Sequence, residues 1–196
     1  MISVESRLRY ISELNNTVTV SETPIKDLLV LEPRVFQDER GYFFESYNEQ
    51  SLTDHISTRW IQDNESKSTV GVLRGLHYQT GENAQAKLVR SVIGEIFDVA
   101  VDLRPDSPTF KRWYGLILSG ENKKQLYIPR GFAHGFLVLS DEAIFSYKCD
   151  NFYAPESEGG IRFDDEVLGI QWPVPENGLV LSEKDRHLPS FNNRKI

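Results

Sequence analysis

Short apolar segments separated by turn residues dominate the pattern of this chain. From Thr17 onward, runs rich in β-branched and aromatic side chains alternate with Gly, Pro, Asn and Asp, as in β-strands joined by tight turns. The segments expected to form strands are 18–20, 28–31, 41–47, 87–92, 95–103, 113–118, 125–128, 135–139 and 143–148. Many short strands with Gly and Pro punctuation predict an all-β fold, a β-sandwich or a jelly-roll barrel.

One of these segments shows a regular alternation of apolar and polar residues. In 95–103 the odd positions are Glu, Phe, Val, Val and Leu, whereas Asp98 and Asp102 have the other parity. Successive side chains of a strand point to opposite faces, so the pattern predicts a half-buried strand. Helical periodicity is confined to two short stretches, 48–54 and 164–168.

No repeat, low-complexity tract or shift in composition marks a linker in the chain. Residues 17–196 are therefore expected to fold as a single domain, and a chain of this length buries roughly 70% of its unfolded surface. Residues 1–16 are expected to form a polar N-terminal extension that is loosely held.

Composition narrows the classes of function. The chain is 39% hydrophobic and 26% charged, with a formal net charge of −7. This acidic balance disfavours binding along nucleic-acid backbones, so any phosphate must be held by locally clustered cations. Cys149 is the single cysteine, and no apolar run is as long as a signal-peptide core or a membrane span. We therefore expect a soluble cytoplasmic protein that binds neither nucleic acid nor membrane.

A histidine and several cations lie in one otherwise apolar, strand-like region, 71–90. It contains Arg74, His77 and Lys87. Buried cations are costly unless they are paired or hold an anion, and cations beside a histidine favour its neutral, proton-accepting form. The region therefore indicates a base that faces an anion.

The spacing of Arg74 and His77 makes a geometric demand on this region. They are three residues apart, so on a regular strand they would point to opposite faces. Gly75 lies between them. A bulge or bend at this glycine would bring both side chains to one side, and bulges are common beside active sites. The sequence thus predicts an irregular strand at Gly75.

The other three histidines differ in their surroundings. His55 and His187 lie in polar, loop-like segments typical of the surface. His134 lies in a segment with a tight turn, flanked by Phe132 and Phe136. It is either a core histidine bonded to a backbone carbonyl or a second residue of the site.

Two further side chains would complete such a site. Tyr147 is either a packing residue or an acid opposite His77, because a phenol can donate a proton. Asp185 is either part of a solvated charge run or the carboxylate that orients the His77 imidazole. A base and an acid on opposite walls would make a two-sided proton exchanger.

Two motifs, around His77 and His134, resemble the halves of the cupin signature. A metal-binding cupin would carry a histidine at Gln79 and a carboxylate at Lys87. An ammonium group cannot ligate a divalent cation and would repel it. We therefore expect no metal and no cofactor, with a metal-dependent cupin enzyme as the alternative.

Eight spaced segments, in one order, resemble those of the dTDP-4-dehydrorhamnose 3,5-epimerase family from about residue 19 to residue 189. They are DERG (38–41), IQDN (61–64), GVLRGLHYQ (71–79), QAKLVR (85–90), DVAVDLR (98–104), SPTF (107–110), PRGFAHGF (129–136) and LSEKD (181–185). The combination is far more specific than any single segment.

The resemblance implies a fold, a reaction and a set of site residues. The fold is a cupin-type jelly roll, and the reaction is epimerisation at C3 and C5 of dTDP-4-dehydro-6-deoxy-D-glucose, on the route to dTDP-L-rhamnose. His77 would be the base, Tyr147 the acid and Asp185 the partner of His77, while Tyr153 would stack on the thymine. The positions that match those around the ketone and its enolate are Arg74, Lys87 and His134, and those that match nucleotide or sugar contacts are Arg40, Glu45, Gln62, Asp63, Asn64, Glu158 and Lys184.

The resemblance also implies a homodimer in which the N-terminal strand crosses to the partner. Arg40 and Glu45 would then complete the neighbour's site. The residues leave two other functions open: an enzyme that inverts only C3 or only C5, and a non-catalytic jelly roll that binds sugar nucleotides.

Overall fold

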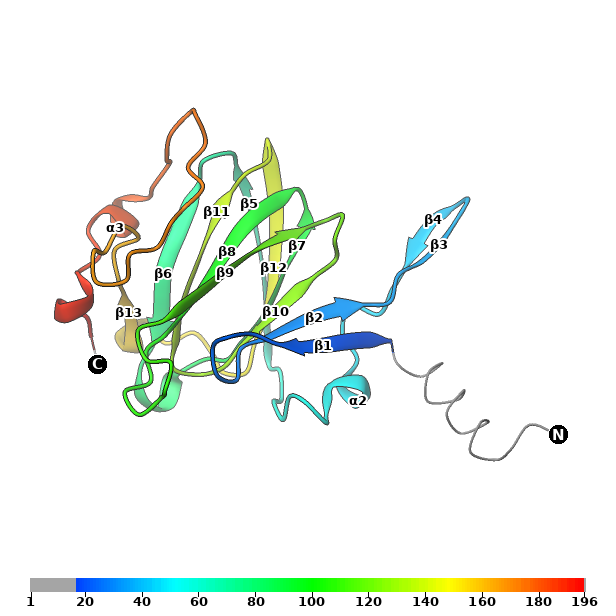
Figure 1. The fold of residues 1–196 in the computed structure, drawn as a ribbon, viewed down its shortest axis with the longest axis horizontal. Helices are drawn as coiled ribbons and strands as arrows, with labels where there is room; N and C mark the ends of the chain where they lie inside the picture. Colours follow the sequence, from blue (N-terminus) through cyan, green and yellow to red (C-terminus); the bar gives the residue numbers. More distant parts are fainter. Residues whose placement is uncertain (1–16, 196) are drawn as a thin grey trace.

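Two antiparallel β-sheets face each other in the computed structural model, which describes residues 17–195 (Figure 1). The six-stranded sheet consists, in order, of β1 (Val18–Glu22), β2 (Leu29–Pro33), β10 (Gln125–Ile128), β7 (Lys87–Ile93), β12 (Glu142–Cys149) and β5 (Gln62–Thr69). The five-stranded sheet consists of β13 (Glu158–Gly160), β6 (Leu73–Gln79), β11 (Phe132–Val138), β8 (Glu95–Asp102) and β9 (Trp113–Ser119). The predicted all-β jelly roll is confirmed, and the expectation for residues 1–16 lies outside the described residues.

The remaining elements are short. β3 (Phe36–Asp38) and β4 (Gly41–Phe43) form a hairpin that projects away from both sheets (Figure 1). The helical segments are α2 (Glu49–Leu52), α3 (Glu183–Arg186) and the 3-10 turns η1 (Gly81–Asn83), η2 (Pro155–Ser157) and η3 (Phe191–Asn193). None of the helices in the described part of the chain has the length and apolar character needed to cross a membrane.

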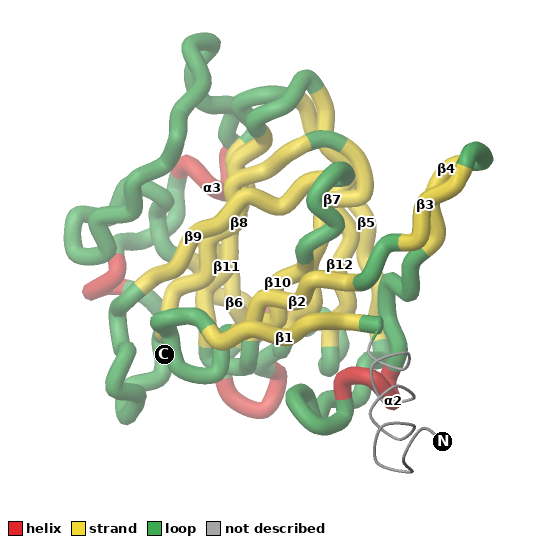
Figure 2. The backbone as a smooth tube through the Cα atoms, turned by 45° about the vertical axis from the view of Figure 1, so that its right-hand side comes forward, coloured by secondary structure: helices red, strands yellow, loops and turns green. Residues whose placement is uncertain are grey.

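The main core lies between the two sheets. Val89, Leu126 and Phe145 of the six-stranded sheet pack there against Ile96 and Phe136 of the five-stranded sheet. The two sheets form the walls of the barrel (Figure 2). A second cluster, on the outer face of the five-stranded sheet, contains residues of the C-terminal segment. Phe136 and Phe145 of the main core also border a cavity whose other lining residues are mostly polar.

Strand β8 corrects the prediction of a half-buried strand. Asp98 and Asp102, expected to face solvent, are both 0% exposed. The apolar positions of the other parity, including Val99 and Val101, are covered by the C-terminal segment, so the strand is buried on both faces. Buried carboxylates need partners; Asp102 accepts hydrogen bonds from Ser107 and from two other neighbours, Arg104 and Thr109.

Other local predictions have mixed outcomes. The helix expected at 48–54 is present as α2, capped by Asn48, but 164–168 forms turns instead of a helix. There the Asp165 carboxylate accepts from the backbone of Val167 and Leu168, a local bond that competes with helix formation. The strand expected over 41–47 ends at Phe43.

Gly75 interrupts β6 as the sequence predicts. In the pairing with β11, His77 lies opposite His134 and Arg74 opposite Phe136, so β6 carries one extra residue between the two pairs. Gly75 itself has φ of +124°. Both Arg74 and His77 line the same cavity. The predicted bulge is confirmed, and it brings the two side chains to one side.

Replacing Gly75 with alanine is expected to lower the free energy of unfolding by about 2 kcal/mol more than the same change at Gly41. The two glycines have nearly the same φ, +124° and +127°. A Cβ at Gly75 would lie 2.6 Å from Gly135 Cα and 2.8 Å from His134 O, whereas nothing lies within 4 Å of one at Gly41. Urea unfolding of both variants separates the steric effect from the backbone effect. Equal losses of unfolding free energy in the two variants would contradict the prediction.

Candidate active site

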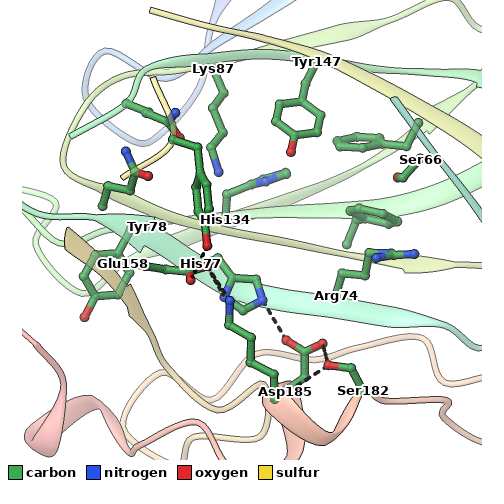
Figure 3. A pocket seen from close by; sticks show the side chains of 16 residues that line it. Ser66, Arg74, His77, Tyr78, Lys87, His134, Tyr147, Glu158, Ser182 and Asp185 are labelled. Atoms are coloured by element: carbon green, nitrogen blue, oxygen red, sulfur yellow. Dashed lines mark hydrogen bonds and ion pairs between the residues drawn. The ribbon is translucent and has the colours of Figure 1, made fainter. Parts of the chain in front are cut away.

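A cavity of about 320 Å³ lies between the two sheets, next to the main core (Figure 3). Strands of both sheets, the loop after β12 and the segment around α3 contribute side chains to it. The lining residues are Ser66, Arg74, His77, Tyr78, Gln79, Gln85, Lys87, His134, Phe136, Phe145, Tyr147, Tyr153, Glu158, Ser182, Lys184 and Asp185. Nine of these are residues that the sequence proposed for the site.

His77 and Asp185 form a hydrogen-bonded pair in this cavity. His77 Nε2 lies 2.7 Å from Asp185 Oδ1, and a carboxylate is an acceptor, so Nε2 carries the proton. Nδ1 is then the nitrogen that can accept a proton. It is enclosed and has no hydrogen-bond partner among the described residues. The pairing selects the tautomer that a base requires.

The start of α3 holds the Asp185 carboxylate. Ser182 caps the helix by accepting from the Asp185 backbone N–H, and its hydroxyl donates to Asp185 Oδ2 at 2.6 Å. The Gly75 N–H donates to Oδ1. Burial opposes the charged form, but the hydrogen bonds from His77 and Ser182 outweigh it and lower the pKa of Asp185. Asp185 is therefore a buried, ionised partner and not part of a solvated charge run.

A second histidine–carboxylate pair lies beside the first. His134 Nε2 is 2.9 Å from Asp98 Oδ2, and both side chains are buried. The His134 ring also stacks on Phe145, with centroids 5.9 Å apart. His134 is thus bonded to a carboxylate, not to a backbone carbonyl. Asp98 was missed as a site residue; its parity within β8 was visible, but the direction of that face was not.

Two cations reach the cavity from opposite sheets. Lys87 lies on β7 and Arg74 on β6. Burial lowers the pKa of Lys87, although the nearby Cys149, Asp98 and Glu158 oppose this effect. Its Nζ is 5.8 Å from the centroid of the Tyr147 ring, and Arg74 Nε donates to Ser68 Oγ at 3.2 Å. The two cations thus differ in their surroundings: Lys87 is half-buried between the sheets, whereas Arg74 is exposed to solvent.

Tyr147 lies on β12, in the sheet opposite to the one that carries His77. Its ring packs against Phe145 at 5.5 Å between centroids. Burial, reinforced by Cys149 and opposed by Arg74, raises the pKa of the phenol. Tyr147 thus retains its proton at neutral pH and can act as a donor.

Three further residues proposed from the sequence form a polar cluster at the mouth of the cavity. Glu158 accepts from Lys184 Nζ at 2.6 Å and from the Tyr153 hydroxyl at 3.0 Å. Burial acts to raise the pKa of Glu158, but the hydrogen bonds from Lys184 and Tyr153 outweigh it and lower the pKa, so the carboxylate is ionised. Tyr153 is 55% exposed, which leaves its ring available to a ligand.

The remaining predicted residues lie outside the cavity lining. On β5, Gln62 accepts from the Tyr153 backbone N–H and Asn64 donates to Cys149 Sγ, while Asp63 pairs with Lys148. Arg40 is bonded to Asp38 on the β3–β4 hairpin, with 84% of its side chain exposed, and Glu45 accepts from Asn48. The structure does not bring Arg40 and Glu45 to the cavity of their own chain.

The positions of the cupin metal signature are used differently here. Gln79 donates to the carbonyls of Asn83 and Phe152 and accepts from the Ala154 N–H, so it holds the loop that carries Tyr153. Lys87 lines the same cavity as His77 and His134, each of which is bonded to a carboxylate. Across residues 17–195 no three His, Cys, Asp or Glu side chains converge in a way that would hold a metal ion. His55 and His187 are exposed, as predicted.

Comparison with known proteins supports the resemblance seen in the sequence. The family model for dTDP-4-dehydrorhamnose 3,5-epimerase matches residues 22–193. The dTDP-4-dehydrorhamnose 3,5-epimerase of Salmonella typhimurium is 57% identical over 175 residues, which cover 87% of this chain and 93% of the relative. The chain belongs to the dTDP-4-dehydrorhamnose 3,5-epimerase family.

Solved structures of epimerases share this fold. A 3,5-epimerase from Legionella pneumophila, in complex with dTDP-4-keto-L-rhamnose, has a TM-score of 0.87 at 49% identity and covers 90% of this chain and 94% of its own. A 3′-monoepimerase from Streptomyces bikiniensis, in complex with dTDP-quinovose, has a TM-score of 0.80 at 34% identity, covering 86% and 85%. The epimerase fold thus serves both double and single inversion.

Proposed function

We propose that this epimerase inverts C3 and C5 of dTDP-4-dehydro-6-deoxy-D-glucose and forms dTDP-4-dehydro-L-rhamnose, within the biosynthesis of dTDP-L-rhamnose. One observation carries the proposal: His77 and Tyr147 lie on opposite sheets and line the same cavity. Inversion requires a proton to leave one face of a carbon and another to arrive at the opposite face. A base and an acid on facing walls meet that requirement.

His77 removes the proton. The C4 ketone acidifies the protons on C3 and C5, because the electron pair left behind is delocalised onto the ketone oxygen as an enolate. Asp185 holds the proton of His77 on Nε2, so the substrate proton goes to Nδ1. The buried carboxylate then stabilises the imidazolium that forms.

Cations in the cavity stabilise the enolate oxygen. Lys87 and Arg74 supply positive charge, and His134, held by Asp98, also lines the cavity. Preorganised charge aimed at the atom where negative charge develops is usually the largest single contribution to catalysis. These side chains perform the task that a metal ion has in other cupins.

Tyr147 returns a proton from the opposite face. Because burial raises the pKa of its hydroxyl, the phenol is protonated when the enolate forms. Transfer to carbon leaves a phenolate beside Lys87, whose ammonium lies near the Tyr147 ring. The phenolate takes up a proton from solvent, and the imidazolium of His77 releases one, which restores both groups.

The mouth of the cavity receives the nucleotide. Tyr153, with an exposed ring, stacks on the thymine, and Lys184 lies within reach of the diphosphate. Gln62, Asp63 and Asn64 form the β5 side of this region, and Gln62 also fixes the backbone at Tyr153.

A homodimer explains the positions of Arg40 and Glu45. Both lie on or beside the hairpin that projects from the sheets, where Tyr42 and Phe43 are 56% and 66% exposed. Exposed aromatic surface of this kind suits a protein interface. In a dimer with exchanged N-terminal strands, the two residues reach the partner's cavity. A cytoplasmic location accords with the single, buried thiol of Cys149.

Incubation with dTDP-4-dehydro-6-deoxy-D-glucose in deuterium oxide is expected to place deuterium at both C3 and C5, because each inverted carbon receives its proton from a group that exchanges with solvent. Proton NMR of the sugar measures the loss of both signals. Labelling at one carbon alone would assign a single-centre epimerase, and labelling at neither would refute the proposal.

A further inference from the structure

Glu158 lies beside the proton-accepting nitrogen of the base. Its Oε1 is 4.0 Å from His77 Nδ1, on the side of the ring away from Asp185. Glu158 belongs to the edge strand β13, which pairs with β6 and places Gly160 opposite His77. His77 is therefore flanked by two carboxylates from two different segments of the chain.

The two oxygens of Glu158 are already engaged. Lys184 donates to Oε1 and the Tyr153 hydroxyl to Oε2, and the carboxylate is 21% exposed. The resemblance matches Glu158 to a nucleotide or sugar contact, but the two protein donors already hold both of its oxygens in place. Its fixed position next to Nδ1 points to an effect on the base.

Proton transfer to His77 changes the pattern of charge among Asp185, His77, Glu158 and Lys184. Before proton transfer, Asp185 and Glu158 are negative, His77 is neutral and Lys184 is positive. After His77 accepts the substrate proton, the row Asp185, His77, Glu158 and Lys184 alternates in sign. Opposite charges within 4 to 6 Å favour the charged form of a group, and the side chains of His77 and Glu158 are only 25% and 21% exposed, so water screens the attraction in part.

We propose that Glu158 is a positioning residue for proton abstraction, which stabilises the imidazolium of His77 at Nδ1 while Asp185 holds Nε2. The substrate proton moves to Nδ1 and its electron pair remains in the enolate, so Glu158 stays ionised throughout. Lys184 and Tyr153 fix the carboxylate and keep it from taking the proton itself. This inference rests on the proposed function, because it needs His77 to act as a base.

The expected effect of Glu158→Gln is a change in catalysis without a comparable change in nucleotide binding. The amide keeps the shape but loses the charge, so kcat falls about 10- to 100-fold, and the acid limb of the pH profile of kcat/KM moves about one unit to lower pH. Affinity for dTDP, measured by calorimetry, stays within about twofold. Glu158→Asp, which keeps the charge, recovers part of kcat.

Lys184→Met is the matched variant, for which the expected shift of the pH profile has the opposite direction. Loss of the ammonium leaves the Glu158 charge less neutralised, so the acid limb moves to higher pH. The other titratable groups that line the cavity around His77 are unchanged in all three variants: Arg74, Tyr78, Lys87, His134, Tyr147, Tyr153 and Asp185.

An unshifted pH profile in both Glu158→Gln and Lys184→Met would overturn the inference, as would a loss confined to dTDP affinity, which would assign Glu158 to nucleotide binding. Near-ultraviolet circular dichroism checks that each variant is folded. Failure of the proposed function is a separate result, because the unmodified protein would then label neither C3 nor C5.

Discussion

Replacing His77 with asparagine is expected to reduce kcat by about three orders of magnitude, within the usual range for loss of a general base. Nδ1 of His77 is the acceptor that Asp185 leaves free, and no other described side chain in the cavity combines a hydrogen-bonded carboxylate partner with an enclosed, unpartnered nitrogen. NMR of the sugar product in samples quenched at successive times measures kcat, and deuterium incorporation reports directly on C–H cleavage.

His187→Asn is the control for this change. His187 has 76% of its side chain exposed and lies outside the cavity, so its replacement leaves kcat unchanged. Binding of dTDP to His77→Asn stays close to that of the unmodified protein, because the nucleotide contacts lie at the mouth of the cavity. A variant that retained more than about a tenth of kcat would exclude His77 as the base.

Replacing Lys87 with methionine is expected to lower kcat about 100- to 1000-fold while raising the free energy of unfolding by about 1 kcal/mol or more. The activity falls because the enolate loses preorganised positive charge. The stability rises because Lys87 is half-buried and burial lowers the pKa of its ammonium, whereas an apolar side chain of similar length carries no desolvation cost. Urea unfolding and product formation measure the two effects.

Lys67→Met provides the comparison. Lys67 lies on β5 with 60% of its side chain exposed and pairs with Glu142, and exposed pairs contribute between zero and about 1 kcal/mol. Neither activity nor stability changes appreciably there. A parallel loss of stability and activity in Lys87→Met would instead show that Lys87 supports the fold and has no special electrostatic role.

Strand β5 shows why the sequence pattern could not supply every element of the fold. Its residues, Gln62–Thr69, are almost all polar, so no apolar alternation marks it. It is an edge strand of the six-stranded sheet, paired only with β12, and its inward side chains, such as Ser66, face the cavity instead of the core. Hydrophobic periodicity detects strands that pack against a core, and this one packs against a site.

The sequence predicted the chemical groups of the site but not which of them form hydrogen bonds with one another. Arg74, His77 and Lys87 were identifiable because cations and a histidine in an apolar strand are costly without a role. The hydrogen bond between His134 and Asp98 could not be predicted, because the alternation along a strand shows that its two faces differ but not which face points inward. Asp185 was open between two interpretations until the position of α3 placed it 2.7 Å from His77.

The carboxylate that completes the base is supplied by a segment that follows every labelled strand of both sheets. Gly75 and Asp185, which are hydrogen-bonded, are 110 positions apart in the chain, and α3 begins at Glu183. During synthesis, the strands β1 to β13 therefore leave the ribosome before Asp185 does. A nascent chain at that stage holds His77 without the partner that selects its tautomer. The growing polypeptide therefore acquires the complete His77–Asp185 pair only after all the strands have been synthesised, and a shorter nascent chain lacks the complete base.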